Sequence, residues 1–247
     1  MPQAKFLPLI SLATLIIVWE TISIVIDSPS LPSPERVIHV LIEETINGTL
    51  LSNLGVTLTR LTISFIIAML LGSAIGILLG RRNRLNQFFD GWIIILLNIP
   101  ALVTIILSYV WFGLVESAAI LAVVVNKVPN VVVTLREGTR VLDRNLLELA
   151  EVYRLSRMQT FTDVICPQLY PFFMTAARTG LALIWKIILV VEMLGRSDGM
   201  GYQLHLYFQL FDVAGILAYT VAFIAVIQLI ELLILKPIDQ YAQRWRR

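Results

Sequence analysis

The sequence predicts an all-α membrane protein in which six transmembrane helices form a single domain, residues 1–247. Of its 247 residues, 57% are hydrophobic and only 15% are charged, and the mean hydropathy is +0.83. Soluble globular domains contain about 25% charged residues. The apolar residues also occur in blocks of roughly 20, the length at which a helix crosses the hydrocarbon core of a bilayer. Composition and block length together favour a helical membrane domain over a soluble one.

Six apolar blocks are long enough to span a membrane: residues 6–26, 62–80, 88–114, 117–135, 170–194 and 213–235. The first block is long, and the IDSPSLPSPE that follows it has no Ala-x-Ala cleavage pattern, so we interpret it as a helix and not as a signal peptide. Pro100 and Pro129 lie inside the third and fourth blocks, where each is expected to kink or break its helix. Between the first two blocks, SPERVIHVLIEETI predicts a short interfacial helix.

The distribution of basic residues predicts the orientation. If the N-terminus is cytoplasmic, thirteen of the nineteen Lys and Arg residues fall in inside segments, and three, Arg36, Arg60 and Arg196, fall in outside segments. Cytoplasmic loops of membrane proteins contain an excess of Lys and Arg. Both termini and the 34-residue loop 136–169 are therefore expected to face the cytoplasm.

The loop 136–169 is expected to contain two short helices. Asn145 is a candidate N-cap with Glu148 three residues later, and Ser156 with Gln159 repeats this pattern before Pro167 ends the second helix. Apolar side chains follow the first cap along one side: Leu146, Leu149, Val152 and Tyr153. A loop that only reconnects two spans needs a handful of residues. The segment is therefore either a docking surface for a cytoplasmic partner or a helix pair lying on lipid.

The same loop resembles the EAA loop of permease subunits of bacterial ABC importers. That loop contains Glu-x-Ala, a Gly six residues after the Glu, and a Pro nineteen residues after it. Glu148, Ala150 and Pro167 are in register with this pattern, whereas Arg154 replaces the glycine. Since a left-handed conformation costs Arg more than Gly, we expect the corner between the two short helices nearer Ser156.

Nearly the whole chain is similar to the branch of this family that handles nitrate, sulfonate, taurine and related small anions. The similarity rests on the order of several short sequences: IIVWETI, LPSPERV, LTRLTISFIIAMLLGSAIGILLGRR, WFG at 111–113 and GMGY at 199–202. Arg178, Trp185 and Glu192 in the fifth block also match. The loop GRSDGMGYQLHLYFQLFD is either a contact for a binding protein or a simple turn of the chain.

The resemblance implies a type I ABC importer in the bacterial cytoplasmic (inner) membrane. Two permease chains, expected as a homodimer, would work with two cytoplasmic ATPases and an extracytoplasmic substrate-binding protein. Coupling to the ATPase would involve six loop residues: Glu148, Ala150, Tyr153, Arg154, Ser156 and Pro167. This chain would bind no cofactor, and ATP with Mg would belong to the partner ATPase. Consistently, the chain contains no G-x-x-x-x-G-K-[ST] sequence.

Charged side chains at membrane depth are candidates for the translocation pathway. Lys127, beside Asn126, lies near the middle of the fourth block, and Lys186 lies in the middle of the fifth. Arg178 precedes Lys186 by about two helical turns, so the two side chains could share a face. Intramembrane charges are costly and usually face a cavity or a partner. A cationic lining would suit an anionic substrate.

A second interpretation of these charges remains open. Lys127 or Lys186 could form internal ion pairs with Glu20 or Glu192 and serve only structure. Glu192 matches a family position, so gating or packing is its expected role. The pathway and gate residues expected from the sequence are Asn126, Lys127, Arg178, Lys186 and Glu192.

Other classes of function are less well supported. An ion-coupled secondary transporter is the alternative, but such folds often contain two similar halves, and no internal repeat is evident. H-E-x-x-H is missing, and Cys166 has no nearby His to activate it, which disfavours an enzyme. One Cys and two His predict no metal site, and a net charge of +2 gives no argument for nucleic-acid binding. We therefore expect a non-catalytic transport subunit.

Overall fold

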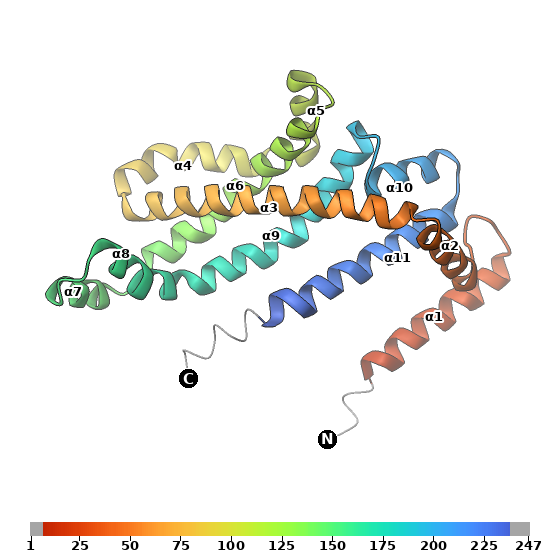
Figure 1. Ribbon diagram of the computed structural model, residues 1–247, viewed down its shortest axis with the longest axis horizontal. Coiled ribbons are helices and arrows are strands. Elements are labelled where there is room, and N and C mark those ends of the chain that lie inside the picture. The colour runs from red at the N-terminus through yellow and green to blue at the C-terminus, as the bar shows by residue number, and fades with distance from the viewer. Residues whose placement is uncertain (1–6, 238–247) are drawn as a thin grey trace.

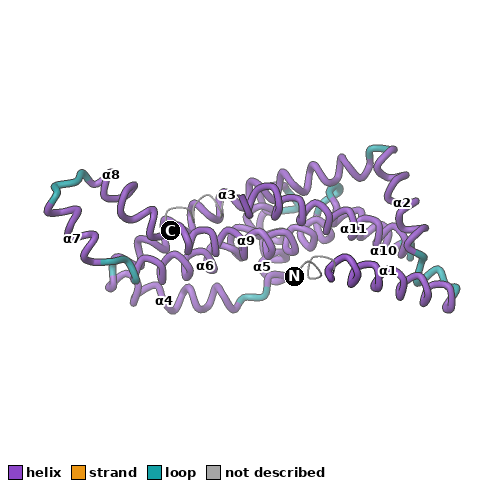
Figure 2. Tube along the Cα trace, turned by 90° about the horizontal axis from the view of Figure 1, so that it is seen from below, coloured by secondary structure: helices purple, strands orange, loops and turns teal. Residues whose placement is uncertain are grey.

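Three long helices form the centre of the computed structural model, which describes residues 7–237. These are α3 (Thr49–Arg81), α6 (Glu116–Arg140) and α9 (Cys166–Gly195), and α6 packs against both of the others (Figures 1 and 2). The largest cluster of buried side chains lies where these helices meet α5 (Ala101–Phe112), and it includes Ile105, Ala122, Ile184 and Trp185. The core of the protein is therefore made by helices from separate parts of the sequence.

Glycines allow α3 and α6 to approach closely. Gly72, Gly76 and Gly80 are four residues apart, so they lie on one side of α3. A Cβ at Gly76 would lie 2.7 Å from the Val132 carbonyl oxygen, and one at Gly80 would lie 2.5 Å from the Thr139 Cβ. Small residues at this spacing let helix backbones pack against each other in membranes. The contact between α3 and α6 therefore depends on the absence of side chains at these positions.

The remaining helices surround this centre. In chain order they are α1 (Leu7–Ile26), α2 (Pro34–Ile46), α4 (Asn83–Asn98), α7 (Arg144–Val152), α8 (Arg157–Gln159), the π-helical turn η2 (Thr160–Ile165), α10 (Met200–Gln209), α11 (Val213–Ile230) and the π-helical turn η3 (Glu231–Leu235). The loop with α7 and α8 lies at one end of the molecule, and α2 and α10 lie at the other (Figures 1 and 2). The predicted interfacial helix is α2, with Ser33 as its N-cap and Pro34 in its first turn.

The predicted helical membrane fold is confirmed. Four helical segments are long and apolar enough to cross a bilayer: Thr49–Arg81, Glu116–Arg140, Arg157–Gly195 and Val213–Ile234. The pair α4 and α5 counts as a fifth if it forms one bent span, and α1 contributes the shorter apolar stretch Ile10–Ile26. The number of six spans therefore stays a prediction.

The two prolines behave differently. At Pro100 the predicted span 88–114 is broken, because α4 and α5 meet at an angle of 95°. Pro129 was predicted to kink or break its helix, and it does not break it, since α6 runs without interruption from Glu116 to Arg140 with Pro129 buried inside it. A kink at Pro129 stays a prediction. Neighbouring helices can hold a proline-containing membrane helix together.

The second predicted span, 62–80, began too late. α3 already starts at Thr49, because Asn53, Thr57 and Arg60 are polar but buried within the bundle. Arg60 was predicted in an outside loop and instead lies inside this helix. Hydropathy alone missed the first turns because it treats every polar residue as exposed, whereas these side chains have hydrogen-bond partners within the protein.

Candidate functional site

The first short helix of the loop is α7, and its cap differs from the predicted one. Asp143 is the N-cap, because its side chain accepts a hydrogen bond from the Asn145 N–H at 2.8 Å. The assignment of Asn145 as N-cap was wrong by two residues, since Asn145 already lies in the first turn. Glu148 is exposed on this helix, and Ala150 is buried against the rest of the protein.

The outward face of α7 is apolar and exposed. It consists of the four side chains expected to share one side: Leu146, Leu149, Val152 and Tyr153, with exposed fractions of 43, 51, 77 and 72%. Exposed apolar side chains of this size in one group are typical of surfaces that another molecule covers. We call these four residues the α7 docking face.

The corner after α7 is at Arg154, not nearer Ser156 as expected. Arg154 has a φ of 54°, in the left-handed region. The Arg154 N–H donates to the Glu151 carbonyl and the Leu155 N–H donates to the Ala150 carbonyl, both at 2.9 Å. This is the hydrogen-bond pattern that ends many helices with a left-handed residue, usually glycine. Arg154 therefore adopts a backbone conformation that glycine favours.

The second short helix begins as predicted but does not end at Pro167. The Ser156 and Gln159 side chains form both hydrogen bonds of a capping box. After α8 the helix continues through η2 into α9, and Pro167 lies in the first turn of α9. Pro167 lacks an N–H, and the preceding turn is π-helical, with the Cys166 N–H bonded to the Phe161 carbonyl. The predicted loop 136–169 is thus shortened at both ends by helix.

The pathway candidates divide between two environments. Arg178 and Lys186 are both exposed on α9, and the Arg178 Nε lies 3.5 Å from a carboxylate oxygen of Glu231. Within residues 7–237, no carboxylate lies within 4 Å of Lys186. Asn126 is half-buried and donates to the Ala122 carbonyl of its own helix. The exposed face of α9 therefore carries two basic side chains about two turns apart, and Arg178 is paired with Glu231.

Lys127 is instead buried, with 1% of its surface exposed. Its stem passes beside Gly180 of α9, where a Cβ would lie 2.7 Å from the Lys127 Cε. No ion pair of Lys127 exists among the described residues. The interpretation in which Lys127 or Lys186 pairs with Glu192 was wrong, because Glu192 has a different partner.

That partner is Arg60, which the sequence analysis did not identify as a site residue. Arg60 Nη1 donates to Glu192 Oε1 at 2.8 Å, and both side chains are buried. Arg60 Nε and Nη2 also donate to Glu116 at 2.6 and 2.9 Å, and Nη2 bonds the carboxylate of Asp198. Arg196 Nη2 lies 2.9 Å from Glu116. Two arginines and three carboxylates thus join α3, α6, α9 and the segment after α9.

Glu192 is the most buried carboxylate of this cluster. Besides Arg60, Thr57 Oγ1 and the Gly201 N–H donate to it, each at 2.9 Å. Gly201 lies so close that a Cβ there would meet the Glu192 Cβ at 2.8 Å, and Gly199 has a φ of +99°. The GMGY sequence therefore brings the Gly201 N–H to a buried carboxylate. A sequence signal existed: Asn53, Thr57, Arg60 and Ser64 recur at helical spacing.

With this geometry in view, the comparisons with known proteins identify the family. Residues 68–245 match the family described as the binding-protein-dependent transport system inner membrane component. The chain belongs to this family. The permease is 33% identical over 190 residues to the putative aliphatic sulfonates transport permease protein SsuC of Escherichia coli, covering 76% of this chain and 72% of the relative.

Other relatives have related descriptions. The permease is 29% identical over 194 residues to the SsuC protein of Bacillus subtilis, covering 78% of this chain and 70% of the relative. It is 26% identical over 204 residues to the nitrate import permease protein NrtB of Synechocystis, covering 79% of this chain and 74% of the relative. The predicted resemblance to the nitrate, sulfonate and taurine branch of ABC importer permeases is confirmed.

Solved structures support the fold. The model matches a chain of the inward-facing MetNI methionine ABC transporter with a TM-score of 0.71 and 16% identity, covering 81% of this permease and 98% of that chain. A chain of an amino acid ABC transporter matches with a TM-score of 0.65 and 18% identity, covering 81% and 97%. At these identities the comparison establishes the shared helical fold.

Proposed function

We propose that this permease forms the translocation pathway of an ATP-driven importer for a small oxyanion, such as a sulfonate or nitrate. The observation that supports the ATP-driven mechanism best is the α7 docking face, which belongs to a rigidly capped loop and is covered by no described part of the chain. Separate ATPase subunits dock there, through the segment from Glu148 to Pro167. Their closure moves this segment and switches the helices between inward and outward access.

The solute class is proposed from two sources. The names of the relatives specify aliphatic sulfonates, taurine and nitrate, each of which contains a negatively charged oxyanion group. The exposed face of α9 carries Arg178 and Lys186, which suits such a group if this face lines the pathway between two copies of the permease. A homodimer would place two such faces opposite each other. An extracytoplasmic binding protein delivers the solute.

The proposal includes an orientation in the bacterial cytoplasmic membrane. Both termini and the α7 to η2 segment face the cytoplasm, and the Arg60 cluster lies near the outer surface. The outside segments contain only three basic residues, Arg36, Arg60 and Arg196, against thirteen in the inside segments. The alternative, an ion-coupled secondary transporter, gives no role to the α7 docking face.

The test is ATP hydrolysis by the complete complex in lipid, with and without the binding protein. Glu148→Arg should abolish stimulation by the binding protein or detach the ATPase, because it reverses a charge beside the α7 docking face. Glu43→Arg is the matched control, since Glu43 is an exposed glutamate on α2 at the opposite end of the molecule. If no ATPase co-purifies and uptake follows an ion gradient, the secondary-transporter alternative replaces the proposal.

A further inference from the structure

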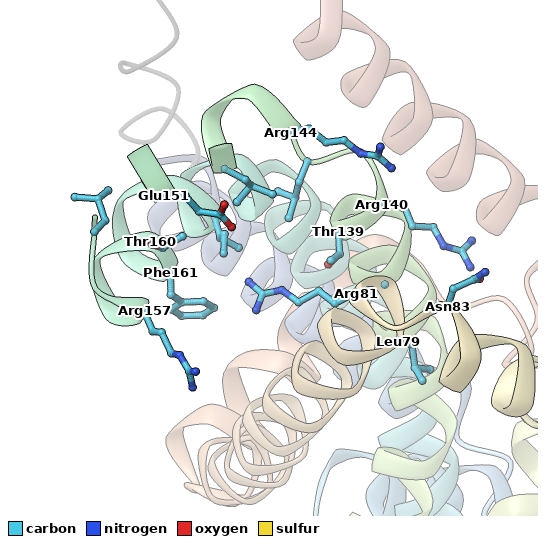
Figure 3. Close-up of a pocket in the computed structure, with 15 residues that line it drawn as sticks. Leu79, Arg81, Asn83, Thr139, Arg140, Arg144, Glu151, Arg157, Thr160 and Phe161 are labelled. Atoms are coloured by element: carbon cyan, nitrogen blue, oxygen red, sulfur yellow. The ribbon is translucent and has the colours of Figure 1, made fainter. Parts of the chain in front are cut away.

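A cleft of about 1040 Å³ lies between the loop helices and the ends of two long helices. Its walls come from the last residues of α3 and α6 on one side, and from α7, α8 and η2 on the other (Figure 3). Small-molecule sites usually occupy about 300–1000 Å³. The cleft is therefore larger than a bare inorganic oxyanion needs.

The cleft is strongly basic. Arg81, Arg140, Arg144 and Arg157 line it, against the single carboxylate of Glu151, which leaves a formal charge of +3. Figure 3 shows Arg81 extending from the end of α3 toward Phe161 and Glu151. We call the space lined by these four arginines the basic cleft.

Most of this positive charge has no counter-ion in the part of the chain that the structure describes. Arg140 is bonded to Glu137 at 2.9 Å, but across residues 7–237 no carboxylate lies within 4 Å of Arg81, Arg144 or Arg157. Several unneutralised arginines around one concave space repel each other and attract an anion. Planar guanidinium groups bind phosphate oxygens particularly well.

Part of the remaining lining is apolar. Leu142, Leu147, Leu155 and Phe161 contribute to the same cleft. A free inorganic anion gains nothing from such side chains, whereas a molecule with a charged head and a hydrocarbon tail can use both parts. The lining therefore favours an amphiphilic anion.

The position of the basic cleft also favours an amphiphilic anion. Gly80 and Arg81 are the last residues of the apolar helix α3, and Thr139 and Arg140 are the last residues of α6. Where apolar spans end, the surrounding lipid presents its headgroups. In the proposed orientation this is the cytoplasmic leaflet, where anionic lipids attract clustered Lys and Arg, and basic pockets between helices bind lipid headgroups.

On α7 the basic cleft lies on the opposite side from the α7 docking face, although residues 151–165 of the segment proposed to couple to the ATPase contribute to its lining. On α7, Arg144, Leu147 and Glu151 face the cleft, and at 100° per residue they lie within about 60° of each other. Leu149 and Tyr153 of the α7 docking face lie on the other side of this helix and do not line the cleft. A bound molecule in the cleft would therefore support α7 from behind while its docking face stays available.

We propose that the basic cleft binds the headgroup of an anionic phospholipid, with its arginines contacting the phosphate and its apolar wall contacting the first part of the acyl chains. This inference rests on the proposed orientation of the loop but does not require ATPase docking. A bound lipid would stabilise the position of the loop relative to α3 and α6.

The test uses the full-length permease in neutral detergent, titrated with dioctanoyl phosphatidylglycerol or dioctanoyl phosphatidylcholine and followed by native mass spectrometry. One phosphatidylglycerol per chain should bind, and phosphatidylcholine should bind at least tenfold more weakly. Arg81→Gln and Arg157→Gln should each weaken phosphatidylglycerol binding about fivefold, as expected for one basic residue at a lipid surface. Arg82→Gln and Arg84→Gln are the matched controls, because these exposed arginines lie next to Arg81 but do not line the cleft.

Four results would overturn the proposal. Equal binding of both lipids, or equal weakening by the control variants, would mean that no built headgroup site exists. Displacement of the lipid by millimolar inorganic phosphate would indicate a free-anion site. Loss of the bound lipid when the cognate ATPase assembles would assign the cleft to that subunit. ATP hydrolysis by the same Arg81→Gln complex, measured separately, distinguishes failure of this inference from failure of the proposed function.

Discussion

Replacing Glu192 by glutamine should destabilise the permease far more than the same change at an exposed ion pair. In the native protein Glu192 is fully buried and accepts hydrogen bonds from Arg60, Thr57 and the Gly201 N–H. Glutamine keeps one acceptor oxygen for Arg60, but its amide would turn a donor toward the Gly201 N–H. The substitution therefore leaves a buried donor without an acceptor and removes the negative charge that strengthens the Arg60 bond.

The magnitude follows from these two losses. An unsatisfied buried donor costs about 1–3 kcal/mol. A neutral acceptor gives Arg60 roughly half the hydrogen-bond strength of a charged one, although Glu116 and Asp198 still bind the guanidinium. We expect a total of about 2–4 kcal/mol, which at roughly 2–4 °C per kcal/mol for a chain of this size lowers the unfolding temperature by about 4–16 °C.

The assay is thermal unfolding of the purified permease in one detergent at a fixed scan rate, because membrane-protein unfolding is often irreversible and then depends on rate. Glu137→Gln is the matched control. Glu137 also has arginine partners, Arg136 at 3.1 Å and Arg140 at 2.9 Å, but its side chain is 49% exposed. Exposed pairs contribute about 0–1 kcal/mol, so the control should shift the unfolding temperature by less than about 3 °C. Equal shifts for the two variants would refute the buried-carboxylate argument.

Three further predictions concern packing, backbone strain and a buried charge. Gly76→Ala should lower the unfolding temperature, because the new Cβ would lie 2.7 Å from the Val132 carbonyl oxygen. The control Gly91→Ala places a Cβ where nothing lies within 4 Å, so it should leave the unfolding temperature unchanged or raise it slightly. Equal effects of the two variants would contradict the close contact of α3 and α6. In chemical unfolding, Arg154→Gly should keep the free energy of unfolding or increase it by up to about 1 kcal/mol, because glycine adopts a φ of 54° without strain. Arg154→Val should lower the free energy of unfolding by at least about 1 kcal/mol. The reverse order of the two variants would exclude the left-handed corner. Lys127→Met should raise the unfolding temperature, because it removes a buried ammonium that has no ion-pair partner among the described residues. A lowered unfolding temperature would contradict this and show that the ammonium has a stabilising partner in the assembled protein.

The sequence by itself determined the class of fold and the family of this permease. Blocks of about 20 apolar residues leave few structures possible in lipid, because every backbone polar group must be satisfied within the segment. The capping box at Ser156 and Gln159 and the apolar side of α7 were also predictable, since caps and helical periodicity depend only on residues three or four positions apart. The same local pattern located the N-cap of α7 only to within two residues, because Asp and Asn are both good N-caps and Asp143 and Asn145 are both available.

Only the tertiary structure decided which polar residues inside the apolar blocks meet one another. Arg60 and Glu192 are 132 positions apart, so no local pattern could pair them. Lys127, which the sequence offered as a partner of Glu192, lies beside Gly180 instead. Likewise, Pro100 lies at a break between two helices, whereas Pro129 lies inside an unbroken helix, because packing in the core holds the residues around Pro129 in place. The basic cleft also depends on three helix ends that meet in space. Local chemistry specified the elements, and burial of their polar groups against distant partners specified their arrangement.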